Sequence, residues 1–347
     1  MSMYKYVIKR ILLAFVTLFI ILSLTFILVK LLPFQRPVGT NETMFSYYAD
    51  QVSDGYVLDS RSPSSRYGEL LWNYRDPSNR NHYYYQVPIM QQYGAWLKNI
   101  FTAWDWGTSV KIQPNVQAMT IIGERLPTSI SINIISVIIS VPLGIALGIW
   151  AALKKNKPTD HIISTVVMIL IAIPSFVLIT FLLYTFATVL DWLPTQWPSP
   201  SADVGTKVAG YVLPVVCLSF GSICGYTRFV RAELCEVMSS EYLLLARTKG
   251  LTKRQAILRH ALRNAMVPIV PSILAEFISI LGGSMILENI YGIPGIGNLF
   301  VTALNSPDYN VLFVDMAVFT SIGLLAGILL DLSYGFIDPR IRMGAKK

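Results

Sequence analysis

The chain has 347 residues, of which 53% are hydrophobic and only 14% are charged. Ordinary soluble domains carry about 25% charged residues, so this composition excludes a soluble globular protein. The apolar residues form runs long enough to cross about 30 Å of hydrocarbon, which takes roughly 20 helical residues. The formal net charge of +8 lies mostly in short segments between these runs, so we interpret it as a determinant of membrane topology rather than as a site for an anionic ligand.

The apolar runs predict an all-α integral membrane protein with six transmembrane helices. The predicted spans are residues 11–32, 126–153, 161–190, 208–229, 267–287 and 311–334. Most of the Lys and Arg residues lie before the first span, after the second, after the fourth and at the C-terminus, and the positive-inside rule makes these segments cytoplasmic. Both termini are therefore expected inside the cell.

The spans divide the chain into four regions. We expect the cytoplasmic N-terminus and first span in 1–33, an extracytoplasmic domain in 34–118, the other five spans in 119–342 and a cytoplasmic tail in 343–347. The second region is too long for a simple connection, which favours a small folded domain or an ordered lid. One helix face within it is spaced i, i+3, i+4, i+7 and comprises Ile89, Tyr93, Trp96, Leu97, Ile100, Phe101 and Trp104. This helix either follows the outer membrane interface or packs inside the external domain.

Glycines and prolines mark further positions inside the spans. The pairs Gly144/Gly148 and Gly323/Gly327 have the four-residue spacing that lets another helix approach closely. Pro174 removes one backbone hydrogen bond and is expected to kink the third span.

Residues 239–271 carry the strongest local signals in the chain. Ser239 or Ser240 can cap a first short helix, with Glu241 in its first turn, where a carboxylate suits the positive end of the helix dipole. Gly250 then supplies the left-handed conformation that ends a helix, and Leu251 is placed for the apolar contact that accompanies such an ending.

A second helix is predicted to start directly after this glycine. Thr252 and Gln255 have the capping-box spacing, in which the side chain of each residue accepts a hydrogen bond from the backbone N–H of the other. The helix pair has an apolar face formed by Leu243, Leu244, Ala246 and Leu251. The rim of this face is cationic and comprises Arg247, Lys249, Lys253, Arg254, Arg259 and Arg263. A DNA-binding helix-turn-helix has a similar local pattern, but apolar spans on both sides exclude nucleic acid as the partner. A docking surface for a protein and a solvated, orientation-setting loop both remain open.

Catalytic motifs are missing from the sequence. There is no phosphate-binding loop, no H-E-x-x-H pair and no G-x-S-x-G elbow, and the three histidines, His82, His161 and His260, fall on different segments. We therefore expect no catalytic residues, no metal site and no cofactor bound by this chain. The pattern favours a transport pathway over an enzyme.

Few ionisable residues lie within the spans, namely Lys30, Glu276, Asp315 and Asp331. The Leu, Ile, Val and Phe residues of the fifth span favour insertion by about 3–6 kcal/mol in total, which offsets one central carboxylate at a few kcal/mol. Glu276 is therefore tolerated if it faces protein or water, either in a pathway or in a hydrogen bond between helices. Pro174, Gly282 and Gly283 are the other candidates for the pathway lining.

The glycine-broken segment resembles the cytoplasmic motif of membrane subunits of ATP-binding-cassette importers. The matching residues are Glu241, Ala246, Gly250 and Val267-Pro268, with Tyr242 and Leu243 in place of two alanines. Several other stretches resemble the peptide-importer branch of that family: Ala246-Arg-Thr-Lys-Gly-Leu251, Arg259-His-Ala-Leu-Arg-Asn264, Glu124-Arg-Leu-Pro127, Ile173-Pro-Ser-Phe176, Glu288-Asn-Ile, Pro294-Gly-Ile-Gly297 and Asp338-Pro-Arg-Ile-Arg342. The resemblance covers residues 1–33 and about 88–342, whereas residues 34–87 look like an inserted domain.

The resemblance implies the type I importer permease fold and a set of partners. The chain would pair with a second homologous permease, two ATPase subunits that bind ATP and Mg, and an extracytoplasmic peptide-binding protein or lipoprotein. Residues 239–265 would couple the ATPases to the spans, with Glu241, Ala246, Arg247, Lys249, Gly250 and Leu251 at the contact. Members of the branch also carry nickel or glutathione. A self-contained secondary transporter and a structural scaffold are the alternatives from other functional classes.

Overall fold

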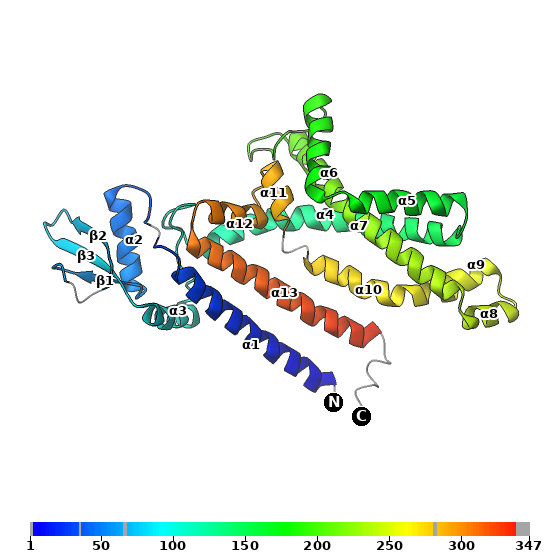
Figure 1. Ribbon diagram of the computed structural model, residues 1–347, viewed down its shortest axis with the longest axis horizontal. Helices are drawn as coiled ribbons and strands as arrows, with labels where there is room; N and C mark the ends of the chain where they lie inside the picture. The colour runs from blue at the N-terminus through cyan, green and yellow to red at the C-terminus, as the bar shows by residue number, and fades with distance from the viewer. Residues whose placement is uncertain (1–2, 35, 65–67, 280–282, 338–347) are drawn as a thin grey trace. The chain divides into compact units, whose positions relative to one another are not determined.

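A computed structural model describes residues 3–34, 36–64, 68–279 and 283–337 (Figure 1). These residues form two compact units, one of Met1–Ala14, Pro127–Asn298 and Ile322–Lys347, and the other of Phe15–Leu126 and Leu299–Ser321. The elements are α1 (Met3–Lys30), α2 (Asn41–Ser53), β1 (Val57–Ser60), β2 (Leu70–Arg75), β3 (Asn81–Gln86), α3 (Ile89–Ala103), α4 (Ala118–Leu153), α5 (Pro158–Ala172), α6 (Ser175–Leu182), π-helix η1 (Leu183–Val189), α7 (Val204–Met238), α8 (Glu241–Thr248), α9 (Lys253–Ala256), π-helix η2 (Ile257–Ala261), α10 (Leu262–Ser279), α11 (Met285–Tyr291), α12 (Ile296–Asn305) and α13 (Tyr309–Ile337).

Five helical segments of the described chain are long and apolar enough to cross a membrane. They are Val7–Lys30, Ala118–Leu153, Val204–Met238, Ile257–Ile278 and Tyr309–Ser333. A bent pair, Pro158–Ala172 with Ser175–Val189, makes a sixth if it crosses as one span. The all-α membrane architecture predicted from the sequence is thereby confirmed, with five or six spans in the described residues.

The third predicted span is interrupted rather than kinked. Pro174 lies between α5 and α6, and the two helical segments on either side of it are bent by 96°. The residue before a proline is pushed out of the α region, and Ile173 accordingly has an extended ψ of 119°. The prediction of one continuous helix over 161–190 is therefore wrong at this proline.

Helices α4 and α7 pack closely at the first glycine pair. A Cβ added at Gly144 would lie 2.7 Å from the Tyr226 Cβ, and one at Gly148 would lie 2.8 Å from the Thr227 carbonyl oxygen. The Thr227 hydroxyl also donates to the Gly144 carbonyl at 3.3 Å. This confirms the close approach expected from the spacing. By contrast, a Cβ at Gly323 or Gly327 would meet no described atom within 4 Å, so this pair packs against nothing in the described chain.

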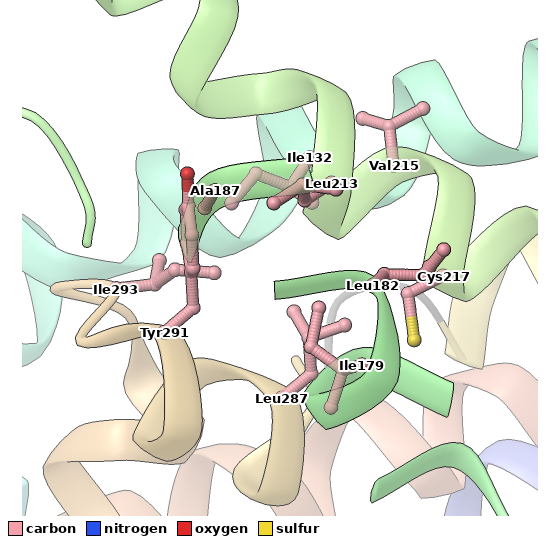
Figure 2. Packing of buried hydrophobic residues seen from close by; sticks show 10 residues of the cluster. All are labelled: Ile132, Ile179, Leu182, Ala187, Leu213, Val215, Cys217, Leu287, Tyr291 and Ile293. Atoms are coloured by element: carbon pink, nitrogen blue, oxygen red, sulfur yellow. The ribbon is translucent and has the colours of Figure 1, made fainter. Parts of the chain in front are cut away.

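A buried hydrophobic cluster joins α4, α6, η1, α7 and α11 (Figure 2). Its members are Ile132, Ile179, Leu182, Ala187, Leu213, Val215, Cys217, Leu287, Tyr291 and Ile293. The Tyr291 hydroxyl leaves the cluster at one end and donates to the Pro194 carbonyl at 3.0 Å, so the only polar atom on this side chain is satisfied. The cluster fixes α11 against the short helix that follows the proline break.

The helix of the fifth span begins earlier than its hydropathy suggests. It continues from the π-helix η2 at Ile257 and is described as far as Ser279, so the predicted span of 267–287 is displaced toward the C-terminus. The following Gly283 has a φ of +63°, which ends helical geometry before α11 begins. Residues 288–310, which lie between the fifth and sixth predicted spans, are mostly helical, because α11 and α12 occupy most of this connection.

The second unit contains a small mixed domain in the region predicted to be extracytoplasmic. Its antiparallel sheet has the order β1-β3-β2, and α2 and α3 flank the sheet in the sequence (Figure 1). Tyr48 of α2 is fully buried and stacks on Trp72 and Tyr84 of the sheet, with ring centroids 5.2 and 4.8 Å apart. The region is therefore a folded domain, as one of the two predictions for it proposed.

The aromatic helix face predicted over 89–104 is real, but its residues have two different surroundings. Trp96 is buried and stacks on Phe26 of α1 with ring centroids 4.8 Å apart, and the Tyr93 hydroxyl bonds Ser23 at 2.8 Å. Phe101 and Trp104 are instead highly exposed. Core packing accounts for the middle of the face, and only its C-terminal end is open to a membrane interface.

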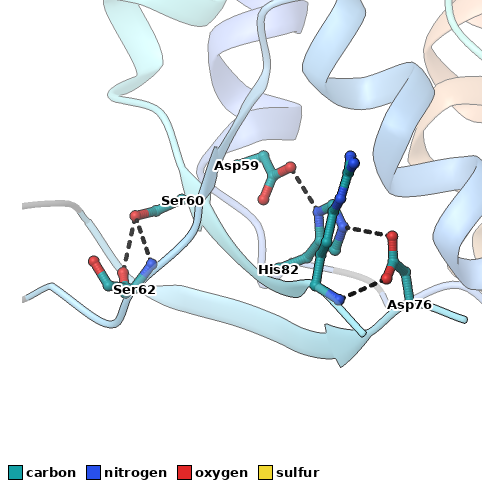
Figure 3. Close-up of polar contacts among 6 residues, drawn as sticks. Asp59, Ser60, Ser62, Asp76 and His82 are labelled. Carbon is teal, nitrogen blue, oxygen red and sulfur yellow. Dashed lines mark hydrogen bonds and ion pairs between the residues drawn. The ribbon is translucent and has the colours of Figure 1, made fainter. Parts of the chain in front are cut away.

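An imidazole lies between two carboxylates at one end of the sheet (Figure 3). His82 Nδ1 is 2.8 Å from Asp59 Oδ2, and His82 Nε2 is 3.6 Å from Asp76 Oδ2. Asp76 also accepts the Arg80 backbone N–H at 2.7 Å, and this hydrogen bond lowers the pKa of its carboxyl group. The cluster joins β1, β3 and the turn before β3, so it serves to hold the sheet together.

We expect the stability of this domain to fall as the pH rises from about 4 to about 6. Burial, with a smaller contribution from the charge of Asp105, raises the pKa of Asp54 from 3.8 to about 6. The folded state then binds the proton more tightly than the unfolded state, so stability decreases until both forms are ionised. Thermal unfolding of the solubilised chain at pH 4.5 and 7 should show this difference, and Asp54→Asn should reduce it. Asp50→Asn at an exposed neighbouring carboxylate is the matched control, and an equal reduction there would contradict the assignment.

Candidate functional site

The helix break at Gly250 is a complete Schellman ending. Gly250 has a φ of +94°, its N–H donates to the Arg247 carbonyl at 3.0 Å, and the Leu251 N–H donates to the Ala246 carbonyl at 3.4 Å. These are the two hydrogen bonds that define the motif, and they satisfy carbonyls that the end of α8 would otherwise leave free. Leu251 packs against the buried cluster around Leu243, as predicted.

The next helix begins with the predicted capping box. The Gln255 N–H donates to Thr252 Oγ1 at 3.3 Å, and the Thr252 N–H donates to Gln255 Oε1 at 3.1 Å. Ser240 occupies the N-cap position of α8, as predicted, but it makes no side-chain cap hydrogen bond, because the Ser239 and Ser240 hydroxyls donate to carbonyls at the end of α7. The second helix is also not separate, since α9 continues through η2 into α10.

One face of α8 is anchored to the spans and the other is open. Leu243 is buried in a cluster with Ala152, Leu234, Cys235, Ala256, Ile257, Ala261 and Ala265, which come from α4, α7, α9, η2 and α10. Tyr242, Leu244 and Leu245 are exposed, so Leu244 belongs to an open face as predicted, whereas Leu243 and Leu251 of the same predicted apolar face pack inward. A hollow of about 190 Å³ lies beside the open face and is lined by Met238, Ser239, Ser240, Leu243, Leu244, Arg247 and Ile257.

Cations surround this open apolar face. Glu241, Arg247 and Lys249 are exposed on α8 and its end, Ala246 is half-buried, and Arg259 and Arg263 are exposed on the following helix. The side chains of Lys253 and Arg254 lie outside the described part of the structure. An exposed apolar face with a polar rim is typical of a protein-binding surface.

Glu276, the central acid of the fifth span, is held by α7. The Ser222 hydroxyl donates to its carboxylate, and the side chain is neither fully buried nor fully exposed. The acid therefore faces protein, which agrees with the expectation that it avoids lipid. Of the other pathway candidates, Pro174 is exposed at the α5–α6 break and Gly282 lies outside the described residues.

A buried carboxylate that the sequence did not single out lies beside Gly283. Glu288 is 2% exposed and accepts hydrogen bonds from Ser129 Oγ at 2.8 Å, the Ser284 N–H at 3.2 Å and the Asn298 N–H at 2.9 Å. We call Glu288 with these three donors the Glu288 site. It ties α4, α11 and the start of α12 together, and Ser129 Oγ in turn accepts the Ile296 N–H at 3.0 Å.

Two glycines leave room for this carboxylate. A Cβ at Gly295 would overlap Glu288 Oε2 and Ser129 Oγ, and a Cβ at Gly283 would lie 2.6 Å from Glu288 Oε1. The sequence did contain a signal for this site, because Glu288 and Gly295 both fall in stretches that carry the family resemblance. Gly283 packs against the Glu288 site, and its place in a pathway lining stays a prediction.

Comparison with known proteins identifies the family. Residues 144–343 match the model of the binding-protein-dependent transport system inner membrane component. The chain belongs to this family. The dipeptide transport system permease protein DppB of Bacillus subtilis is 31% identical over 348 residues, covering 99% of this chain and 100% of the relative. The oligopeptide transport system permease protein OppB of Escherichia coli is 31% identical over 341 residues, covering 98% and 100%. The solved structure of an amino acid ABC transporter with histidines aligns at 18% identity, with a TM-score of 0.47, over 62% of this chain and 94% of that chain.

The family assignment and the apolar helices make this chain a multi-pass component of the plasma membrane and a subunit of a transport system. The region matched by the family model begins in α4 and includes α8, the Gly250 ending and Glu288, whereas the Glu288 donor Ser129 precedes it. The small domain built on β1–β3 precedes that region, although the alignment with DppB extends over 99% of the chain.

Proposed function

We propose that this chain is one of two related permeases in an ATP-driven importer of dipeptides or oligopeptides. It forms half of the translocation pathway and receives cargo from an extracytoplasmic binding protein. Two partner ATPase subunits bind ATP and Mg and dock on the α8 surface, so the chain itself needs no cofactor. The observation that carries the proposal is the α8–Gly250 element, whose open face has no packing partner in the described chain. The names of the relatives, DppB and OppB, support peptides as the cargo.

Purification from the native membrane tests the assembly. We expect a second permease and ATPase subunits to remain bound to the tagged chain, together with a binding protein under mild conditions. Uptake of a labelled dipeptide, with nickel and glutathione as competitors, then tests the cargo. A chain that purifies alone and transports in proteoliposomes without ATP would support the alternative, a secondary transporter.

Glu276 is the first proposed pathway residue. Its bond to Ser222 joins α10 to α7 within the span region, where an ionisable side chain is costly unless it meets protein or water. We expect Glu276→Gln to fold normally and to alter uptake or cargo preference, because it keeps the hydrogen bond but removes the charge. Glu276→Leu should reduce uptake further. Uptake kinetics for several peptides measure both effects, and unchanged kinetics in both variants would make Glu276 a packing residue.

The β1–β3 domain is proposed to be external and to contact the binding protein. Ser62 is exposed beyond β1, whereas the three native cysteines are buried. Labelling of a single introduced cysteine can therefore be measured without a signal from the native ones. Ser62→Cys should react with an impermeant thiol reagent on intact cells. Lys155→Cys, in the cytoplasmic turn after α4, is the matched control and should be protected. The reverse pattern would invert the topology.

A further inference from the structure

Lys30, at the end of α1, lines two adjoining cavities in the second unit. The first has a volume of about 50 Å³ and is lined by residues that include Gln51, Tyr47 and Gln86. The second has a volume of about 20 Å³ and is lined by residues that include Trp96 and Trp106. Lys30, Val29, Tyr56 and Asn310 line both, so the two cavities are neighbours.

The ammonium group of Lys30 is surrounded by aromatic rings. Its Nζ lies 4.7 Å from the ring centroid of Tyr56 and 5.6 Å from that of Phe26. Cation–π contacts attract an ammonium group to the faces of these rings. Among the described residues, no carboxylate forms an ion pair with Lys30 within 4.0 Å, although the Asp54 carboxylate is close enough to interact with it electrostatically.

Further donors without partners line the same space. Gln51 and Trp96 are each 97% buried, and neither Gln51 Nε2 nor Trp96 Nε1 has a hydrogen-bond partner in the described structure. Trp106 Nε1 is buried and equally unpartnered within the described residues. An indole N–H and an ammonium group can only donate, and a buried donor left unsatisfied is unfavourable.

We propose that these cavities bind a small monovalent anion, either a halide or a single carboxylate group. An anion accepts from every donor present, whereas a water molecule must also place its own two hydrogens. The available volume admits a small ion or a carboxylate group, since a single water needs about 10–15 Å³ of such space. The amide oxygens of Gln51 and Asn310 are nearby acceptors, so water alone is the alternative that the experiment must separate.

Chloride binding to the purified complex tests the proposal through ³⁵Cl line broadening in detergent. We expect a saturable component of the line broadening in the wild type. In Lys30→Met the affinity for chloride should fall at least tenfold. Lys98→Met, at an exposed lysine of α3, is the matched control and should retain it. Gln51→Leu, which keeps the charge, should weaken binding about tenfold at most, as expected for one hydrogen bond. Broadening that is absent from the wild type, or equal in wild type and Lys30→Met, would leave only water in the cavities and overturn the proposal.

Competition then identifies the source of the anion. Acetate should displace chloride if the site admits a carboxylate. A dipeptide with a free C-terminus that displaces chloride, while its C-terminal amide does not, would assign the site to the cargo, a reading that rests on the proposed function. If neither peptide competes, the ligand is an inorganic anion. Because binding is measured without transport, failure here is distinct from failure of the proposed import activity.

Discussion

Replacing Gly295 by alanine should strongly reduce the amount of folded permease in the membrane. The added methyl group would overlap Glu288 Oε2 and Ser129 Oγ, which are both buried and fixed by hydrogen bonds. The carboxylate can yield only by leaving its donors, and removing the partners of a buried charge costs about 3–5 kcal/mol. A loss of that size is a large fraction of the stability of a typical protein.

Membrane abundance and the thermal stability of the purified complex measure this effect. Gly221→Ala in α7 is the matched control, because a Cβ there would meet no described atom within 4 Å. The abundance and thermal stability of Glu288→Gln should lie between those of Gly295→Ala and Gly221→Ala. Glutamine keeps the shape of the side chain but places an amide N–H against a backbone or hydroxyl donor. Wild-type abundance in both Gly295→Ala and Glu288→Gln would show that the Glu288 site contributes little to folding.

Features that depend on neighbouring residues could be predicted from the sequence. The Gly250 ending, the Leu251 contact and the capping box of Thr252 and Gln255 all involve hydrogen bonds or packing between residues a few positions apart. The same holds for the helix over 89–103 and for the six apolar runs, because periodicity and hydropathy are read over short windows. For this reason the local structure around α8 was largely predictable.

Features that depend on distant residues could not be predicted in this way. Glu288 and Ser129 are 159 positions apart, and a glutamate in a Gly/Pro-rich stretch is read as part of a loop unless its buried partner is known. Asp160 is another example, because its ion pair with Arg231 of α7, at 2.5 Å, spans 71 positions. The 96° break at Pro174 was underestimated, since the proline predicts loss of a hydrogen bond but not the packing of α6 on α11.

Replacing Gly250 by valine should abolish peptide uptake while the permease still inserts and assembles. A Cβ at Gly250 would meet no described atom within 4 Å, so the only penalty is the backbone conformation at a φ of +94°. That penalty is about 1–2 kcal/mol for an L-residue in the left-handed region, which is small beside the packing of the spans. The Schellman hydrogen bonds would be lost, however, and α8 would change direction relative to α9. A helix that docks in a cleft on an ATPase then no longer transmits closure to the spans.

The measurements for this variant are labelled-dipeptide uptake, membrane abundance and ATPase activity of the purified complex. Gly250→Asn is the matched control, because asparagine tolerates positive φ and should retain substantial uptake. We expect Gly250→Val to show near-normal abundance with either weakly bound ATPase subunits or ATP hydrolysis without transport. If uptake in Gly250→Val equals that of the wild type, the turn is not needed for coupling. If abundance falls together with uptake, the glycine is needed for folding rather than for coupling.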